Sequence, residues 1–280
     1  MSQTQTQAQD AAGSLRLSVR HVTTYAYEPP AAGATMRLRL WPPQYATQVP
    51  EGWRVSVMGE EVVPNVTDGC GVREGIWTSE GPTDRLEVVA EGQVVRTEDQ
   101  GVLHGLKERT PPDVFMRTTP LTTPDAGVRD LAEGARQDDA LSTLHALMGA
   151  VRDAVDYQPD TTNMATSAAS ALSQGRGVCQ DHAHVFIAGA RVLGLPARYV
   201  AGYYMAGDAG DYETHGWAEG YAPGLGWVGF DVANRTCPTR EHVRVACHLD
   251  AGRGALISGA LAGHAEETLT ASVHIEQAQQ

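Results

Sequence analysis

The sequence has few cysteines, few basic residues and no long apolar run, and each shortage excludes a class of protein. Four cysteines in 280 residues are too few for a disulfide-stapled scaffold. Lys and Arg number 21 against 34 Asp and Glu, so the formal net charge is −13. This balance argues against nucleic acids and anionic membranes as partners. The longest apolar candidate, Val185 to Tyr204, is broken by Arg191, Pro196 and Arg198 and is not expected to span a membrane.

The sequence also lacks targeting and nucleotide-binding signals. Residues 1–14 (MSQTQTQAQDAAGS) are polar and have no apolar core, so we expect a disordered leader and not a signal peptide. We therefore expect a cytoplasmic protein whose thiols stay reduced. No phosphate loop or dinucleotide fingerprint occurs, and we expect no cofactor.

The first part of the chain has the pattern of a β-domain. Short runs rich in Val, Thr, Tyr and Arg alternate with turns, and we expect strands at Leu15–Tyr25, Thr35–Leu40, Trp53–Met58 and Arg85–Val95. This spacing predicts a sandwich or barrel over residues 15–106. Four prolines within residues 107–124 then indicate a connector between two domains.

The second part mixes helices and strands. We expect helices after Asp125, at Leu141–Val155, at 166–174 and at Cys179–Val192. Strands are expected at Ala197–Tyr204, Gly216–Ala222 and Trp227–Asp231. Residues 125–247 would form this core. Residues 248–280 would form a C-terminal loop, extending to residue 263, and a final strand at Thr268–Glu276.

Three residues have the arrangement of a nucleophile, a base and an orienting acid. Cys179 follows a Gly-rich turn at the start of a predicted helix, where the helix dipole favours the nucleophilic thiolate. His215 begins one predicted strand and Asp231 ends the next. This order would allow an imidazole to activate the thiol and a carboxylate to orient the imidazole.

The hairpin between these strands provides a geometric test. A two-residue loop at Gly224 and Leu225 would pair Asp231 with Ala218, and His215 would then lie on the opposite face. A three-residue loop centred on Gly224 pairs Asp231 with Trp217 and brings His215 to the same face. A catalytic pair therefore predicts an odd-length loop or an equivalent bulge.

Several segments resemble a known family. The core matches lie at GVCQDHAH (177–184), GLPARYVAGYY (194–204), THGWAEGY (214–221) and PGLGWVGFDVAN (223–234). The matches before the core lie at HVTTYAYEPP (21–30), MRLRLWPP (36–43) and PPDVFMRTTPLTTPD (111–125). Together they resemble the bacterial transglutaminase-like cysteine proteases, of the transglutaminase-like core superfamily.

The resemblance implies a fold class and a set of roles. The fold would be α+β, with a papain-like transglutaminase core behind an N-terminal all-β domain of sandwich type. Cys179 would be the nucleophile, His215 the base and Asp231 the third member of the triad. The chain departs from the family at His182, where an aromatic is usual, and at Gly216, where alanine is usual.

Other residues near the motif have two interpretations each. Gln180 is a candidate for the oxyanion site, beside the backbone N–H of Cys179, or for helix capping. Trp217 is a candidate wall of the substrate site or a packed aromatic. Cys179, His182 and His184 could suggest zinc, but offsets of three and five do not share one helix face, so we expect no metal.

The predicted chemistry is thiol-dependent acyl transfer on an amide of a peptide or protein. With water as acceptor the protein is a cysteine peptidase or amidase, which we favour. With an amine acceptor it is a protein-glutamine transglutaminase. In papain itself the catalytic His follows the Cys by more than about 100 residues. Here His215 follows Cys179 by 36 residues (215 − 179), which argues against papain itself. A non-catalytic peptide-binding or assembly module is the remaining alternative, and the sequence leaves the oligomeric state open.

Overall fold

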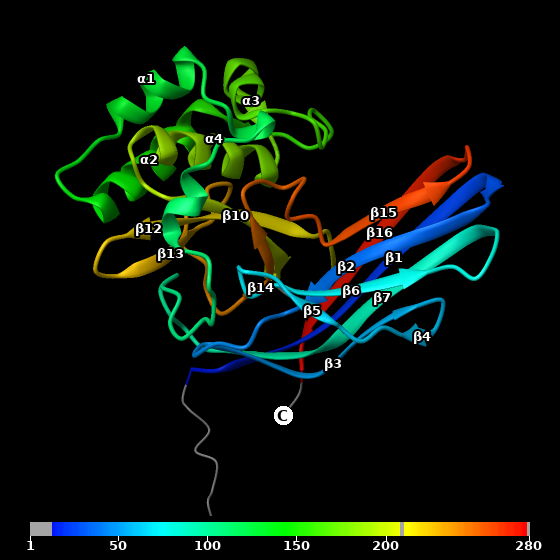
Figure 1. Ribbon diagram of the computed structural model, residues 1–280. Helices are drawn as coiled ribbons and strands as arrows, with labels where there is room; N and C mark the ends of the chain where they lie inside the picture. The colour runs from blue at the N-terminus through cyan, green and yellow to red at the C-terminus, as the bar shows by residue number, and fades with distance from the viewer. Residues whose placement is uncertain (1–12, 208–209, 279–280) are drawn as a thin grey trace, which may run out of the picture.

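The computed structural model describes residues 13–207 and 210–278 and contains two unlike regions (Figure 1). Long antiparallel strands form one end of the molecule, and a four-stranded sheet under a layer of helices forms the other. The α+β class predicted from the sequence is therefore confirmed. The predicted disordered leader lies outside the described residues, except for residues 13 and 14.

Two antiparallel sheets form the β-rich region. The strands that the first part of the chain contributes are β1 (Leu15–Ala31), β2 (Gly33–Trp41), β3 (Gln48–Val57), β4 (Glu60–Glu61), β5 (Val66–Thr67), β6 (Arg73–Thr78) and β7 (Thr83–Arg96). Side chains alternate along β1, so that Leu15, Leu17 and Val19 are buried while Arg16 and Ser18 are partly exposed. This alternation makes one face of the sheet apolar.

The C-terminal segment returns to these sheets. β16 (Glu266–Gln277) pairs with β1 from Leu17 to Glu28, and β11 (Gly210–Tyr212) adds to its outer edge. β15 (Ile257–Ala262) pairs with β2. The final strand was expected, but the loop prediction was wrong over residues 257–262. The run ISGALA has little β propensity and no alternation, so its strand conformation depends on backbone pairing with β2.

The second region packs helices on one face of a sheet. Its helices are η1 (Pro112–Met116), η2 (Pro120–Thr122), α1 (Ala126–Gly134), α2 (Ala140–Ala154), α3 (Ala168–Gln174) and α4 (Cys179–Val192). Its strands are β8 (Asp156–Tyr157), β9 (Arg176–Gly177), β10 (Ala197–Tyr204), β12 (His215–Ala222), β13 (Gly226–Phe230) and β14 (His242–His248). The main sheet has the order β13-β12-β10-β14.

Side-chain caps explain where several helices begin. Asp125, Asp139 and Ser167 each accept a backbone N–H from the first turn of α1, α2 and α3. α4 is buried almost throughout and packs against both β10 and β12. None of the described helices combines the length and apolarity needed to cross a membrane.

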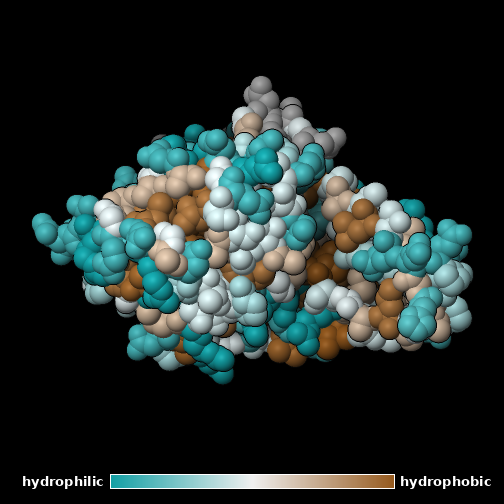
Figure 2. All heavy atoms as spheres, turned by 90° about the horizontal axis from the view of Figure 1, so that it is seen from above, coloured by the Kyte–Doolittle hydropathy of each residue, from teal (hydrophilic) through white to brown (hydrophobic). Residues whose placement is uncertain are grey.

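The proline-rich connector packs tightly against the core. Arg191, at the end of α4, donates from Nε to the Phe115 carbonyl at 2.7 Å and from Nη1 to Thr122 Oγ1 at 2.7 Å. These bonds tie both 3₁₀ turns to α4. Seen from above (Figure 2), hydrophilic side chains cover both ends of the molecule, and hydrophobic atoms form separate patches between them.

Candidate active site

Cys179 occupies the first helical position of α4 and is half-buried. The turn before it is closed by Asp181, whose Oδ2 accepts the Val178 N–H at 2.8 Å and the Thr162 hydroxyl at 2.6 Å. Asp181 is completely buried, so its role is to cap the helix. The thiol therefore lies at the positive end of a well-formed helix, where negative charge is favoured.

His215 and Asp231 meet as the three-residue loop predicts. β12 and β13 pair from Ala218–Phe230 to Ala222–Gly226, which leaves residues 223–225 as the loop. His215 Nε2 lies 2.8 Å from Asp231 Oδ2. The register thus brings both side chains to the same face of the hairpin.

The electrostatics of this pair favour a charged imidazole. Burial lowers the pKa of His215, but hydrogen bonds to Asp231 and Cys179 outweigh it and raise that pKa to about 10. Burial raises the pKa of Asp231, but hydrogen bonds from His215 and His242 bring it well below its usual range. The influence of Cys179 on this pKa shows that the thiol lies near the imidazole.

Two further donors converge on Asp231, and sequence reasoning missed both. His242 Nε2 lies 3.0 Å and Asn234 Nδ2 2.7 Å from Asp231 Oδ2. Asn234 lies three residues after Asp231 in the FDVAN segment, so a local turn could have been suspected. His242 comes from β14, a strand whose run HVRVACH mixes charged and apolar residues and gave no signal.

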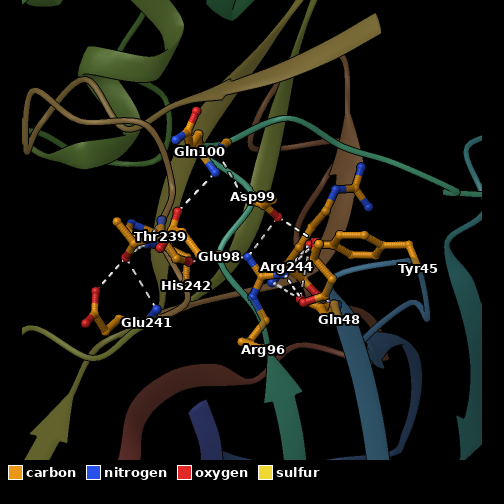
Figure 3. Close-up of polar contacts among 12 residues, drawn as sticks. Tyr45, Gln48, Arg96, Glu98, Asp99, Gln100, Thr239, Glu241, His242 and Arg244 are labelled. Carbon is orange, nitrogen blue, oxygen red and sulfur yellow. Dashed lines mark hydrogen bonds and ion pairs between the residues drawn. The ribbon is translucent and has the colours of Figure 1, made fainter. Parts of the chain in front are cut away.

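The cluster of His215, Asp231 and His242 has donor atoms close enough for a metal ion. The hydrogen bonds of His242 argue against that use. Its Nδ1 accepts the Thr239 N–H at 3.0 Å (Figure 3). This bond fixes the ring proton on Nε2, the atom that lies 3.0 Å from Asp231 Oδ2. Metal binding through Nε2 would require this proton to leave and the Thr239 bond to break. The cluster is therefore better described as a hydrogen-bonded network.

The N-terminal β region supports the strand that carries His242. Gln48, at the start of β3, donates from Nε2 to the Arg244 carbonyl and accepts the Arg244 N–H, each at 2.9 Å. Arg96, at the end of β7, donates to the Thr47 and Thr239 carbonyls at 2.7 and 3.3 Å. Figure 3 shows these residues together beside His242. The start of β14, which carries His242, is thus held by the β-rich region.

Aromatic side chains surround the pair of His215 and Asp231. The Tyr204 ring lies 5.4 Å from the His215 ring and stacks on His242 at 4.2 Å between centroids. Trp217, a candidate wall of the substrate site, is only 2% exposed and lies 6.0 Å from His215. It therefore packs beneath the imidazole.

Tyr157 on β8 is an exposed aromatic residue near Cys179. Its side chain is 49% exposed, and its ring stacks on His182 with centroids 6.1 Å apart. Both His182 ring nitrogens face carbonyl oxygens, of Val178 at 2.8 Å and Val155 at 2.9 Å. His182 thus serves to join the start of α4 to the segment before Tyr157. Gln180 is 8% exposed and makes no side-chain hydrogen bond within the described residues, which leaves it available to a ligand.

Comparisons with known proteins agree with this architecture. The bacterial transglutaminase-like N-terminal region matches residues 17–95, and the transglutaminase-like superfamily matches residues 129–232. An uncharacterised protein of Mycobacterium leprae is 27% identical over 281 residues, spanning 93% of this chain and 98% of that protein. An uncharacterised protein of Mycobacterium tuberculosis is 33% identical over 101 residues, or 32% of each chain.

A solved structure shares the whole fold. A Cytophaga hutchinsonii protein assigned as a cysteine protease superposes with a TM-score of 0.74 at 20% identity, covering 96% of this chain and 92% of that one. Both the N-terminal region and the core are therefore built in the same way. The chain belongs to the transglutaminase-like superfamily, and it carries the bacterial transglutaminase-like N-terminal region in front of its core.

Proposed function

We propose that this protein, a member of a thiol-dependent enzyme family, transfers acyl groups from peptide or protein amides through Cys179 and hydrolyses the resulting thioester. The observation that carries this proposal is the His215–Asp231 bond of 2.8 Å beside a thiol at a helix N-terminus. His215 uses one ring nitrogen for Asp231 and keeps the other for the thiol. This is the geometry in which an imidazole can move a proton.

The reaction would proceed in two halves. The Cys179 sulfur attacks the amide carbonyl carbon, and His215 gives its proton to the departing amine, so that a thioester remains on Cys179. His215 then accepts a proton from water, whose oxygen attacks the thioester and releases the acid and the thiol. Asp231 stays anionic throughout, since its low pKa allows it to hold the imidazolium without taking the proton.

Selective alkylation provides the first test of the nucleophile. We expect iodoacetamide to modify Cys179 much faster than Cys70, because a hydrogen bond that the Cys70 thiol donates to Cys247, together with burial, raises the pKa of Cys70. Cys247 has a pKa lowered to about 6 but is only 1% exposed, which shields it from the reagent. Peptide mass mapping after brief labelling at pH 7 measures all four thiols, which are free.

Acylation provides the second test. We expect p-nitrophenyl acetate to give a burst of nitrophenolate equal to the enzyme concentration, with the acetyl group on Cys179. The Cys179→Ala variant should give no burst, and Cys237→Ala, at a half-buried thiol, should give the full burst. Labelling of Cys179 no faster than Cys70, together with no burst, would refute the proposal. Product formed only when an amine is added would favour the transglutaminase alternative.

A further inference from the structure

The groups described so far leave the reacting carbonyl oxygen short of donors. Acyl transfer places negative charge on this oxygen, and enzymes stabilise it with preorganised hydrogen-bond donors. The first N–H groups of a helix have no intrahelical acceptor. Within the described residues the Cys179 N–H makes no other hydrogen bond, so it can serve as one donor. A second donor would have to lie close to Cys179 and His215.

The hydroxyl of Tyr199 on β10 takes part in none of the contacts described above. The side chain is only 7% exposed, and its ring lies 5.6 Å from that of His184 on α4. Its Oη makes no hydrogen bond to any residue that the structure describes. The hydroxyl is therefore free to bind a group that is absent from the resting protein.

Gly216 fixes where this hydroxyl lies. A Cβ built on Gly216 would overlap Tyr199 Oη and come within 2.8 Å of Tyr199 Cζ. The phenol thus occupies the space of a missing side chain, directly after His215 on β12. An alanine at this position would push the hydroxyl away. The glycine at this position is what admits Tyr199 to the site.

The surroundings keep this hydroxyl protonated. Burial raises the pKa of Tyr199, and the negative charges of Cys179 and Asp181 raise it further. The phenol therefore stays a donor through the neutral range, and it lies within electrostatic reach of the Cys179 sulfur. A protonated donor beside a nucleophilic thiol meets the requirement for stabilising an oxyanion.

We propose that Tyr199, admitted by Gly216, is a catalytic residue whose hydroxyl donates a hydrogen bond to the oxyanion formed when Cys179 attacks a carbonyl. This assignment rests on the proposed function. As sulfur bonds to carbon, the carbonyl π pair moves to oxygen, which accepts from Tyr199 Oη and the Cys179 N–H. When the carbon–nitrogen bond breaks, the pair returns to the carbonyl, and Tyr199 keeps its proton throughout.

Two reactions of the same thiol test this assignment. p-Nitrophenyl acetate acylates Cys179 through an oxyanion, whereas iodoacetamide alkylates it by displacement without one. We expect Tyr199→Phe to slow acylation by about 100-fold, the usual loss for one such donor, and to leave the alkylation rate within about twofold. Gly216→Ala should show the same pattern. The double variant should lose no more than the worse single variant, because both remove one interaction. Tyr221→Phe, on the far end of β12, is the matched control and should keep both rates.

Each other outcome has a definite meaning. Acylation at the wild-type rate in Tyr199→Phe overturns the assignment and leaves the proposed function intact. Parallel loss of acylation and alkylation also overturns it, and would indicate a structural bond from Tyr199 to Asp181, whose buried Oδ1 lacks a partner. Wild-type protein that is alkylated at Cys179 but never acylated would overturn the proposed function itself, together with this assignment.

Discussion

At the scale of single residues, Asp231 is the centre of the site. One oxygen atom, Oδ2, accepts from His215, His242 and Asn234. Three donors on one carboxylate oxygen hold it anionic and fix its orientation, and hence that of the imidazole. The contact between His215 and Asp231 was predictable, because residue order and hairpin parity constrain it. His242 was not, because its contact depends on where β14 packs.

The raised pKa of His215 makes stability depend on pH. The folded protein binds this proton more tightly than the unfolded chain, since the pKa rises from 6.5 to about 10. The resulting stabilisation is fully present below pH 6.5 and is lost as the pH rises toward 10. We expect the free energy of unfolding of wild type to exceed that of His215→Gln most at pH 6, with the gap shrinking steadily up to pH 10.

Urea unfolding at several pH values measures this gap. The exposed His264 supplies the control, and His264→Gln should follow the wild-type curve throughout. A gap between wild type and His215→Gln that stays constant from pH 6 to pH 10 would contradict the shifted titration.

At the scale of elements, the length of one loop determines whether His215 and Asp231 lie on the same face of the hairpin. The turn of residues 223–225 joins β12 to β13, and positive φ angles at Gly224 (85°) and Gly226 (101°) shape it. The odd loop length could be deduced from the sequence by requiring His215 and Asp231 to share a face. Strands with strong alternation, such as β1, and capped helices, such as α2, were also predictable. β14 and β15 were not predictable from the sequence, since these segments become strands through backbone pairing with β10 and β2.

Deleting Gly224 should therefore abolish activity without unfolding the protein. A two-residue loop shifts the register by one position and turns Asp231 to the opposite face from His215. We expect the acylation burst to fall by at least about 1,000-fold, as for loss of a triad member, while far-UV circular dichroism stays the same. Leu225→Ala, at a 40% exposed site in the same loop, should retain the burst. Full activity after the deletion would mean that a bulge restores the register.

At the scale of the whole molecule, the two regions form one interlocked structure. β1 lies between β7 and β16, so the first sheet includes residues from both ends of the described chain. The sequence indicated two successive domains, because the composition changes near the proline-rich connector. Linear composition carries no sign that the C-terminal strands return to β1 and β2. That return is a matter of long-range pairing, which local propensity does not specify.

A buried charge network links the connector, the core sheet and β14. Arg198 is completely buried, donates to Glu219 and Glu108 at 2.6 Å each, and stacks on Trp227 with its guanidinium carbon 3.9 Å from the ring centroid. Arg244 donates to the other Glu219 oxygen at 2.7 Å. Glu219 therefore neutralises two buried guanidinium groups, which lower its pKa.

Removing the charge of Glu219 should weaken the whole fold. Glu219→Gln leaves two buried cations with the single carboxylate of Glu108, and breaking one side of a buried ion pair costs several kcal/mol. We expect urea unfolding at pH 7 to show a loss of about 3 kcal/mol in one cooperative transition. Glu133→Gln, in the exposed pair with Arg136, should leave stability nearly unchanged, since surface pairs are screened by water. Wild-type stability in Glu219→Gln would show that the network adds little to the free energy of unfolding. Two separate transitions would show that the two regions unfold independently.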